Sequence, residues 1–123
     1  MNVKLLRKVQ KHIASEPKRF TFDWMHESDA APCGTRACIA GWTLILGTPG
    51  WSNKTIDEID TLLARRSKSG FGFYTGPASK LLDINYEQAA RLFIYWPEPF
   101  DELKSADTAV ARIEHFIKTK GRE

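Results

Sequence analysis

The sequence is poor in the residues that disulfide-bonded and zinc-binding folds require. It has two cysteines and three histidines in 123 residues, and the cysteines, Cys33 and Cys38, do not form a CxxC pair. A structural zinc site needs four ligands at suitable spacing, so we predict no metal and no cofactor. No apolar run approaches the roughly 18 residues of a membrane span, and residues 1–11 lack the apolar core of a secretion signal. We therefore expect a cytoplasmic protein with reduced thiols and no membrane partner.

The excess of basic over acidic residues is also small. The formal net charge is +3, which does not demand a polyanionic partner. The first twenty residues nevertheless hold six basic side chains and one acidic side chain. Lys4, Arg7, Lys8 and Lys11 are therefore candidates for binding nucleic acid by releasing counterions from phosphates. The alternative is a solvated helix face that keeps the protein soluble.

The length and composition fit one globular domain over residues 1–123, because 42% of the residues are hydrophobic and 27% are charged. Apolar spacing and capping signals predict helices at residues 2–15, 38–46, 55–66, 77–82, 86–95 and 105–119. Thr55 with Glu58, and Asn85 with Gln88, have the spacing of capping boxes. The prediction is an all-α fold, a compact bundle of five to six helices around a central apolar helix.

The central helix is predicted because the run from Cys38 to Leu46 is apolar nearly all round, with Thr35 as a possible N-cap. We expect the first and last helices to flank it. Phe20 to Trp24 alternates aromatic and polar residues, which indicates a short extended aromatic segment lying across the central helix. Residues 25–32 are predicted to be a polar loop.

Cys33 is the candidate nucleophile, because a thiol ahead of a helix N-terminus has a lowered pKa. It would need a base, and His12, His26 and His115 are the three histidines in the sequence, with His26 nearest along the chain. The alternative is that both cysteines are inert and pack the helix start.

The stretch SKSGFGFYTG at residues 67–76 combines three glycines with three aromatic residues, which is typical of a loop anchored by its rings. Such rings beside basic residues could stack on bases or grip a peptide. The binding candidates here are Arg65, Arg66, Phe71, Phe73 and Tyr74.

Three strings, CGTRACIAGW, LLDINYEQAARLF and TAVARIEHFI, resemble small uncharacterised proteins of bacteria and their phages that carry a CGT-x-AC-x-AGW motif. The resemblance implies a bacterial or phage cytoplasmic protein and supplies no activity. The leading hypothesis is a non-enzymatic interaction module that binds a protein partner or itself. The alternatives are a thiol-dependent enzyme or redox protein centred on Cys33, and a nucleic-acid binder acting through the basic N-terminal helix.

Overall fold

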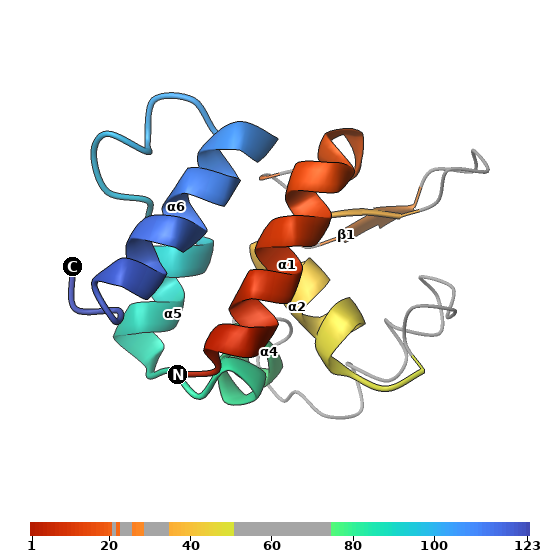
Figure 1. Cartoon of the computed structure of the whole chain (residues 1–123), viewed down its shortest axis with the longest axis horizontal. Coiled ribbons are helices and arrows are strands. Elements are labelled where there is room, and N and C mark those ends of the chain that lie inside the picture. Colours follow the sequence, from red (N-terminus) through yellow and green to blue (C-terminus); the bar gives the residue numbers. More distant parts are fainter. Residues whose placement is uncertain (21, 23–25, 29–34, 51–74) are drawn as a thin grey trace.

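The described residues form a helical bundle with a two-stranded antiparallel sheet at its side (Figure 1). The computed structural model describes residues 1–20, 22, 26–28, 35–50 and 75–123. Within that part lie five α-helices: α1 (Val3–Ser15), α2 (Ile39–Gly47), α4 (Thr75–Leu82), α5 (Tyr86–Phe93) and α6 (Ala106–Lys118). None of the described helices has the length and apolar character to cross a membrane. The predicted all-α class is confirmed, while the helix predicted at 55–66 falls outside the described residues.

Helix α1 is amphipathic, as its spacing predicts. It buries Leu5, Leu6, Val9 and Ile13 and leaves its basic side chains exposed. It ends at Ser15, two residues before Pro17, which opens the short 3-10 helix η1 (Pro17–Arg19).

Asn2 joins the start of α1 to the end of α4. Its side-chain oxygen accepts a hydrogen bond from the Leu5 backbone N–H at 3.0 Å, which caps α1. Its side-chain nitrogen donates to the carbonyl of Leu81 at 3.2 Å, and its backbone N–H donates to the carbonyl of Leu82 at 2.6 Å. One residue therefore satisfies open backbone groups at two helix ends.

Helix α2 is buried through most of its length. Every residue from Ile39 to Ile45 is buried, and helices α1, α4 and α5 pack against it. Its polar groups are satisfied, because the Thr43 hydroxyl donates to the Ile39 carbonyl at 2.7 Å and the Trp42 indole donates to the Arg19 carbonyl at 3.0 Å. The expectation that the last helix also flanks α2 needs correction, because α6 packs mainly along α1.

Helices α1 and α6 lie side by side and run in opposite directions (Figure 1). Arg7 of α1 contacts Glu114 of α6, and the Gln10 side chain donates to the Val110 carbonyl at 3.1 Å. Later residues of α1 therefore meet earlier residues of α6, and the start of α1 lies near the end of α6.

Two three-residue strands replace part of the predicted loop and the predicted Thr35 cap. Strand β1 (His26–Ser28) pairs antiparallel with β2 (Thr35–Ala37), with Glu27 opposite Arg36. Because Thr35 belongs to β2, the N-cap position of α2 falls to Cys38, whose backbone is extended. Strands this short carry too few residues for an alternating pattern to reveal them.

The predicted aromatic segment is described only at Phe20 and Phe22. Phe20 forms an isolated parallel bridge with Ala37. The rings of Phe20 and Phe22 lie 6.4 and 4.8 Å from the ring of Trp96, which is buried just beyond α5. Phe20 and Phe22 therefore both pack against Trp96, close to the end of α5.

Helices α4 and α6 end in the same kind of turn, the Schellman motif. At α6 the Lys120 N–H donates to the Ile117 carbonyl at 3.1 Å and the Gly121 N–H donates to the Phe116 carbonyl at 2.9 Å. The equivalent bonds at α4 run from Asp83 and Ile84. The left-handed position is held by Lys120 and Asp83, both with φ of 55°, where glycine is usual.

Candidate functional site

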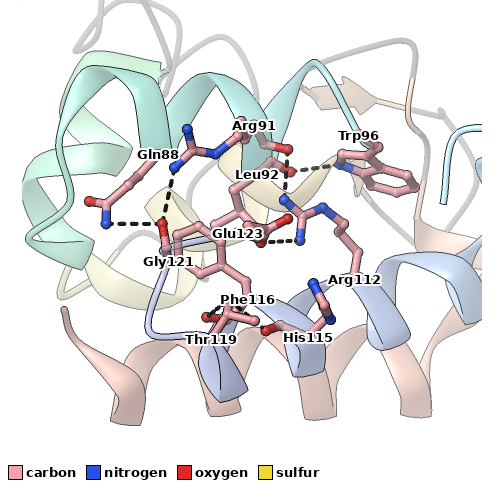
Figure 2. A network of polar contacts seen from close by, with 10 residues as sticks. All are labelled: Gln88, Arg91, Leu92, Trp96, Arg112, His115, Phe116, Thr119, Gly121 and Glu123. Carbon is pink, nitrogen blue, oxygen red and sulfur yellow. Dashed lines mark hydrogen bonds and ion pairs between the residues drawn. The ribbon is translucent and has the colours of Figure 1, made fainter. Parts of the chain in front are cut away.

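A fully buried arginine is the most unusual polar feature of the described residues. Arg112 of α6 has no exposed side-chain surface. Its Nη1 donates to Glu123 Oε1 at 2.5 Å and its Nη2 donates to the Arg91 carbonyl at 3.2 Å (Figure 2). Burial lowers the pKa of Arg112, and the bond to Glu123 opposes that shift. A buried charge of this kind persists only when it is paired and hydrogen-bonded.

The helical repeat of α6 explains why Arg112 points inward. Ala109, Ile113 and Phe116 are buried on the same side of α6. The guanidinium carbon lies 5.8 Å from the ring centre of Phe116 and 5.5 Å from that of Phe100. Two aromatic rings therefore hold the guanidinium in addition to its hydrogen bonds.

Helix α5 holds the chain segment that carries Glu123. The Gly121 carbonyl accepts hydrogen bonds from Arg91 Nη2 at 3.0 Å and from Gln88 Nε2 at 3.4 Å (Figure 2). Gln88 also closes the capping box with Asn85 at the start of α5, as the sequence predicts. The turn at Lys120 and Gly121 then directs Glu123 back toward α6.

The hydrogen bonding of this cluster is incomplete. Arg112 Nε, Arg91 Nε and Glu123 Oε2 are buried and have no hydrogen-bond partner. A guanidinium has five N–H donors, and its strongest complex with a carboxylate uses two parallel bonds. Glu123 bonds to Arg112 through one of its two oxygens, so the guanidinium makes one fewer hydrogen bond to the carboxylate than the two-bond arrangement allows.

A second feature is the connection between α5 and α6, residues 94–105, which is anchored at several points. Trp96 is buried and its indole donates to the Leu92 carbonyl at 2.7 Å. Phe100 lies against Arg112 and also 5.4 Å from the His115 ring. The Lys104 ammonium lies 4.4 Å from the centre of the Phe22 ring. These contacts hold the connection in place at Trp96, Phe100 and Lys104.

The anchored connection leaves two large apolar side chains in solvent. Tyr95 is 69% exposed and Leu103 is 68% exposed. Each directly precedes an anchor, Trp96 or Lys104, and both anchors contact Phe22. Single exposed apolar residues are ordinary. Here two of them project from a segment that is otherwise held in place.

The predicted nucleic-acid residues lie on α1, where all four are exposed. Arg7 is engaged with Glu114, with one contact of 3.0 Å between Nη2 and Oε2 and a shorter one between Nη1 and Oε1. Hydrogen bonds from Arg7 and Gln10 lower the pKa of Glu114 to about 2. Lys8 lies 3.4 Å from the Leu46 carbonyl, while Lys4 and Lys11 extend the same exposed face. The three lysines therefore lie on one exposed face of α1, while the Arg7 side chain is paired with Glu114 of α6.

The thiol candidates are described only in part. Cys33 falls outside the described residues, and His26 is described as part of strand β1 alone. Cys38 is buried and not disulfide-bonded, and burial raises the pKa of its thiol, which disfavours a nucleophilic thiolate.

The other two candidate bases pack against aromatic rings. The His12 ring lies 4.2 Å from that of Trp42, its Nε2 is buried without a partner, and burial and Arg19 lower its pKa. His115 packs on Phe100. The aromatic binding candidates at Arg65, Arg66, Phe71, Phe73 and Tyr74 fall outside the described residues, so that prediction stays untested.

The chain matches no protein-family model and no curated protein, and its fold matches no solved structure. The sequence reasoning missed both features described above. One signal for Arg112 was present, because it falls between Ala109 and Phe116 on the apolar side of α6. No sequence pattern marks Glu123 as its partner.

Proposed function

We propose that the protein is a non-enzymatic interaction module that binds another protein through Tyr95 and Leu103. The observation that carries the proposal is that these two side chains are about two-thirds exposed on a connection whose neighbouring residues are anchored. The proposal keeps the interaction class that the sequence favours and locates it on the described surface.

The energetics of binding support this surface. Ordering a flexible loop on binding consumes part of the interaction free energy, and an anchored loop avoids that loss. Trp96 and Phe100 hold this connection against α5 and α6. Tyrosine is enriched among residues that dominate interface energetics, because it combines a large apolar ring with a polar tip. Tyr95 and Leu103 each expose a large apolar side chain that a partner could cover.

The test places a photo-crosslinking amino acid at position 95 in cells. The matched control places it at position 86, because Tyr86 is 68% exposed on the other end of α5. We expect a discrete adduct from position 95 that disappears when Leu103→Ser is introduced in the same chain. Light scattering on the purified protein then tells whether the adduct contains a second copy of the chain. Identical adducts from both positions, or adducts that survive Leu103→Ser, would contradict the proposal.

The proposed setting is the cytoplasm of a bacterium or a cell infected by its phage, as the resemblance implies. The thiol chemistry at Cys33 and the binding of nucleic acid by α1 stay predictions. Engagement of Arg7 by Glu114 removes one of the four proposed phosphate contacts, so the described residues do not favour the nucleic-acid alternative.

A further inference from the structure

We propose that Arg112 is a carboxylate-binding site, which Glu123 fills as an internal ligand and which a carboxylate from outside the chain occupies when Glu123 withdraws. The site goes beyond the proposed function and does not depend on Tyr95 or Leu103.

The guanidinium is held in place by groups other than Glu123. The Arg91 carbonyl accepts a hydrogen bond from Nη2, and the rings of Phe100 and Phe116 lie on the guanidinium. These contacts come from α5, α6 and the connection between them. The guanidinium therefore has contacts that do not involve residue 123.

The buried charge creates the demand for an anion. Arg112 has no exposed side-chain surface, so without Glu123 it would be an uncompensated charge in a poorly solvated place. One monovalent carboxylate balances one guanidinium. Arg91 already donates to the Gly121 carbonyl, and its Nε is a further buried N–H without a partner. The cluster therefore suits a planar, singly charged carboxylate.

Glu123 is an incomplete and displaceable occupant. It bonds to Arg112 through Oε1, while its Oε2 and the Arg112 Nε have no partner. It arrives on the three residues that follow Lys120, whose φ of 55° is unfavourable for a residue with a Cβ. Its withdrawal breaks no helix. A carboxylate that enters without this tether is free to make two parallel bonds to the guanidinium.

The experiment is chemical rescue of the full-length Glu123→Ala variant. Its thermal unfolding is followed in sodium acetate and in sodium chloride of the same ionic strength. We expect Tm to rise with the logarithm of the acetate concentration, by about 5 °C at tenfold excess over Kd, and to respond less to chloride. A variant that is unfolded in buffer is measured instead by the helical circular-dichroism signal that acetate restores.

Two control variants separate the site from general salt effects. Glu87→Ala removes a glutamate whose side chain is 84% exposed and lies 4.0 Å from Arg91, and we expect no acetate-specific rescue. Arg112→Gln combined with Glu123→Ala removes the proposed site, and we expect the rescue to vanish. Equal effects of acetate and chloride on Glu123→Ala, or equal rescue with and without Arg112, would overturn the proposal.

A second probe identifies the source of the carboxylate. N-acetylglutamate amide carries one side-chain carboxylate on a peptide backbone. Rescue by this compound at lower concentration than acetate assigns the site to an acidic side chain of a protein. Rescue by acetate alone assigns it to small organic acids. Failure of both probes rejects the site.

Discussion

Two arginine–glutamate pairs hold α6, and they lie in opposite surroundings. Arg7 and Glu114 join α1 to α6 at the surface, where 46% and 34% of their side chains are exposed. Arg112 and Glu123 join α6 to the segment that follows it, with side chains that are 0% and 5% exposed. The charged groups are the same in both pairs, but one pair is exposed to water and the other is buried.

The comparison shows why ion pairs cannot be counted as equal contributions to stability. Water and salt screen the exposed pair, which limits its contribution. The buried pair has lost the hydration of both groups, and mutual attraction only offsets that loss. Removing one member of the buried pair leaves a charge with neither water nor partner. The buried pair is therefore critical to the fold even though its net contribution need not be large.

The largest expected effect comes from breaking the buried pair. We predict that Arg112→Ala lowers the free energy of unfolding by about 3–5 kcal/mol, because it removes a buried side chain that packs on Phe100 and Phe116 and leaves the Glu123 carboxylate without its partner. Urea unfolding followed by circular dichroism measures the loss. The matched control is Arg7→Ala, whose effect should be much smaller. Equal effects from the two substitutions would show that burial does not distinguish the pairs.

The next effect tests whether the cost lies in the unpaired charge. We predict that Arg112→Met combined with Glu123→Leu is about 2–4 kcal/mol more stable than Arg112→Met alone, because the double variant buries no charge. The same urea titration measures both proteins. A double variant no more stable than the single variant would place the cost in lost packing against Phe100 and Phe116.

A smaller effect is expected from the turn that delivers Glu123. Gly121 has φ of +72°, and a Cβ there would lie 2.6 Å from Gln88 Nε2. We predict that Gly121→Ala costs about 1–2 kcal/mol, because it strains the backbone and displaces a side chain of the α5 capping box. Thermal or urea unfolding measures the cost. The control is Gly76→Ala, since a Cβ at Gly76 meets no atom within 4 Å and its φ is not in the left-handed region.

A substitution one residue earlier, at Lys120, is expected to raise the stability instead of lowering it. Lys120 occupies the left-handed position of the Schellman turn with φ of 55°. We predict that Lys120→Gly raises the free energy of unfolding by about 0.5 kcal/mol, because relief of the backbone strain exceeds the entropy that glycine adds to the unfolded chain. Differential scanning calorimetry of the two proteins measures the gain. A decrease in Tm would show that the lysine side chain makes a stabilising contribution of its own.

The smallest effect concerns the exposed pair and depends on pH. The pKa of Glu114 is about 2 in the folded protein, below its ordinary value of 4.5. Its ionised form therefore stabilises the fold fully above pH 4.5, and that contribution is lost as the pH falls from 4.5 toward 2. The measurement is the difference in urea midpoint between wild type and Glu114→Gln across this range. A difference that is independent of pH would contradict the assignment.

Much of the fold could be predicted because local signals decide it. The spacing of Leu6, Val9 and Ile13 predicts α1, and the apolar run of α2 predicts its burial. Asn85 and Gln88 predict the start of α5, and the structure confirms their capping box. Each of these signals involves residues within one or two helical turns. Interactions between residues this close along the chain can be predicted from the sequence.

The rest depends on contacts between residues distant in sequence or on conformations without a residue signature. The pairing of β1 with β2 is set by three residues on each side and by the packing around Phe20. Asp83 and Lys120 adopt left-handed backbone angles at positions where glycine would have been the signal. By its residue type alone Arg112 would be predicted to lie in solvent. The structure shows that the segment after α6 supplies a carboxylate, Glu123, for the buried guanidinium. The candidate site therefore lay beyond sequence reasoning except for the position of Arg112 on its helix.

The bridge made by Asn2 has a kinetic consequence. Its bond to the Leu81 carbonyl joins residues 79 positions apart, so forming it carries the entropic cost of closing a long loop. Contacts that are absent from the folding transition state slow unfolding and leave the folding rate unchanged. We therefore predict that the junction between α1 and α4 forms late in folding, so that Asn2→Ala speeds unfolding and leaves the folding rate unchanged.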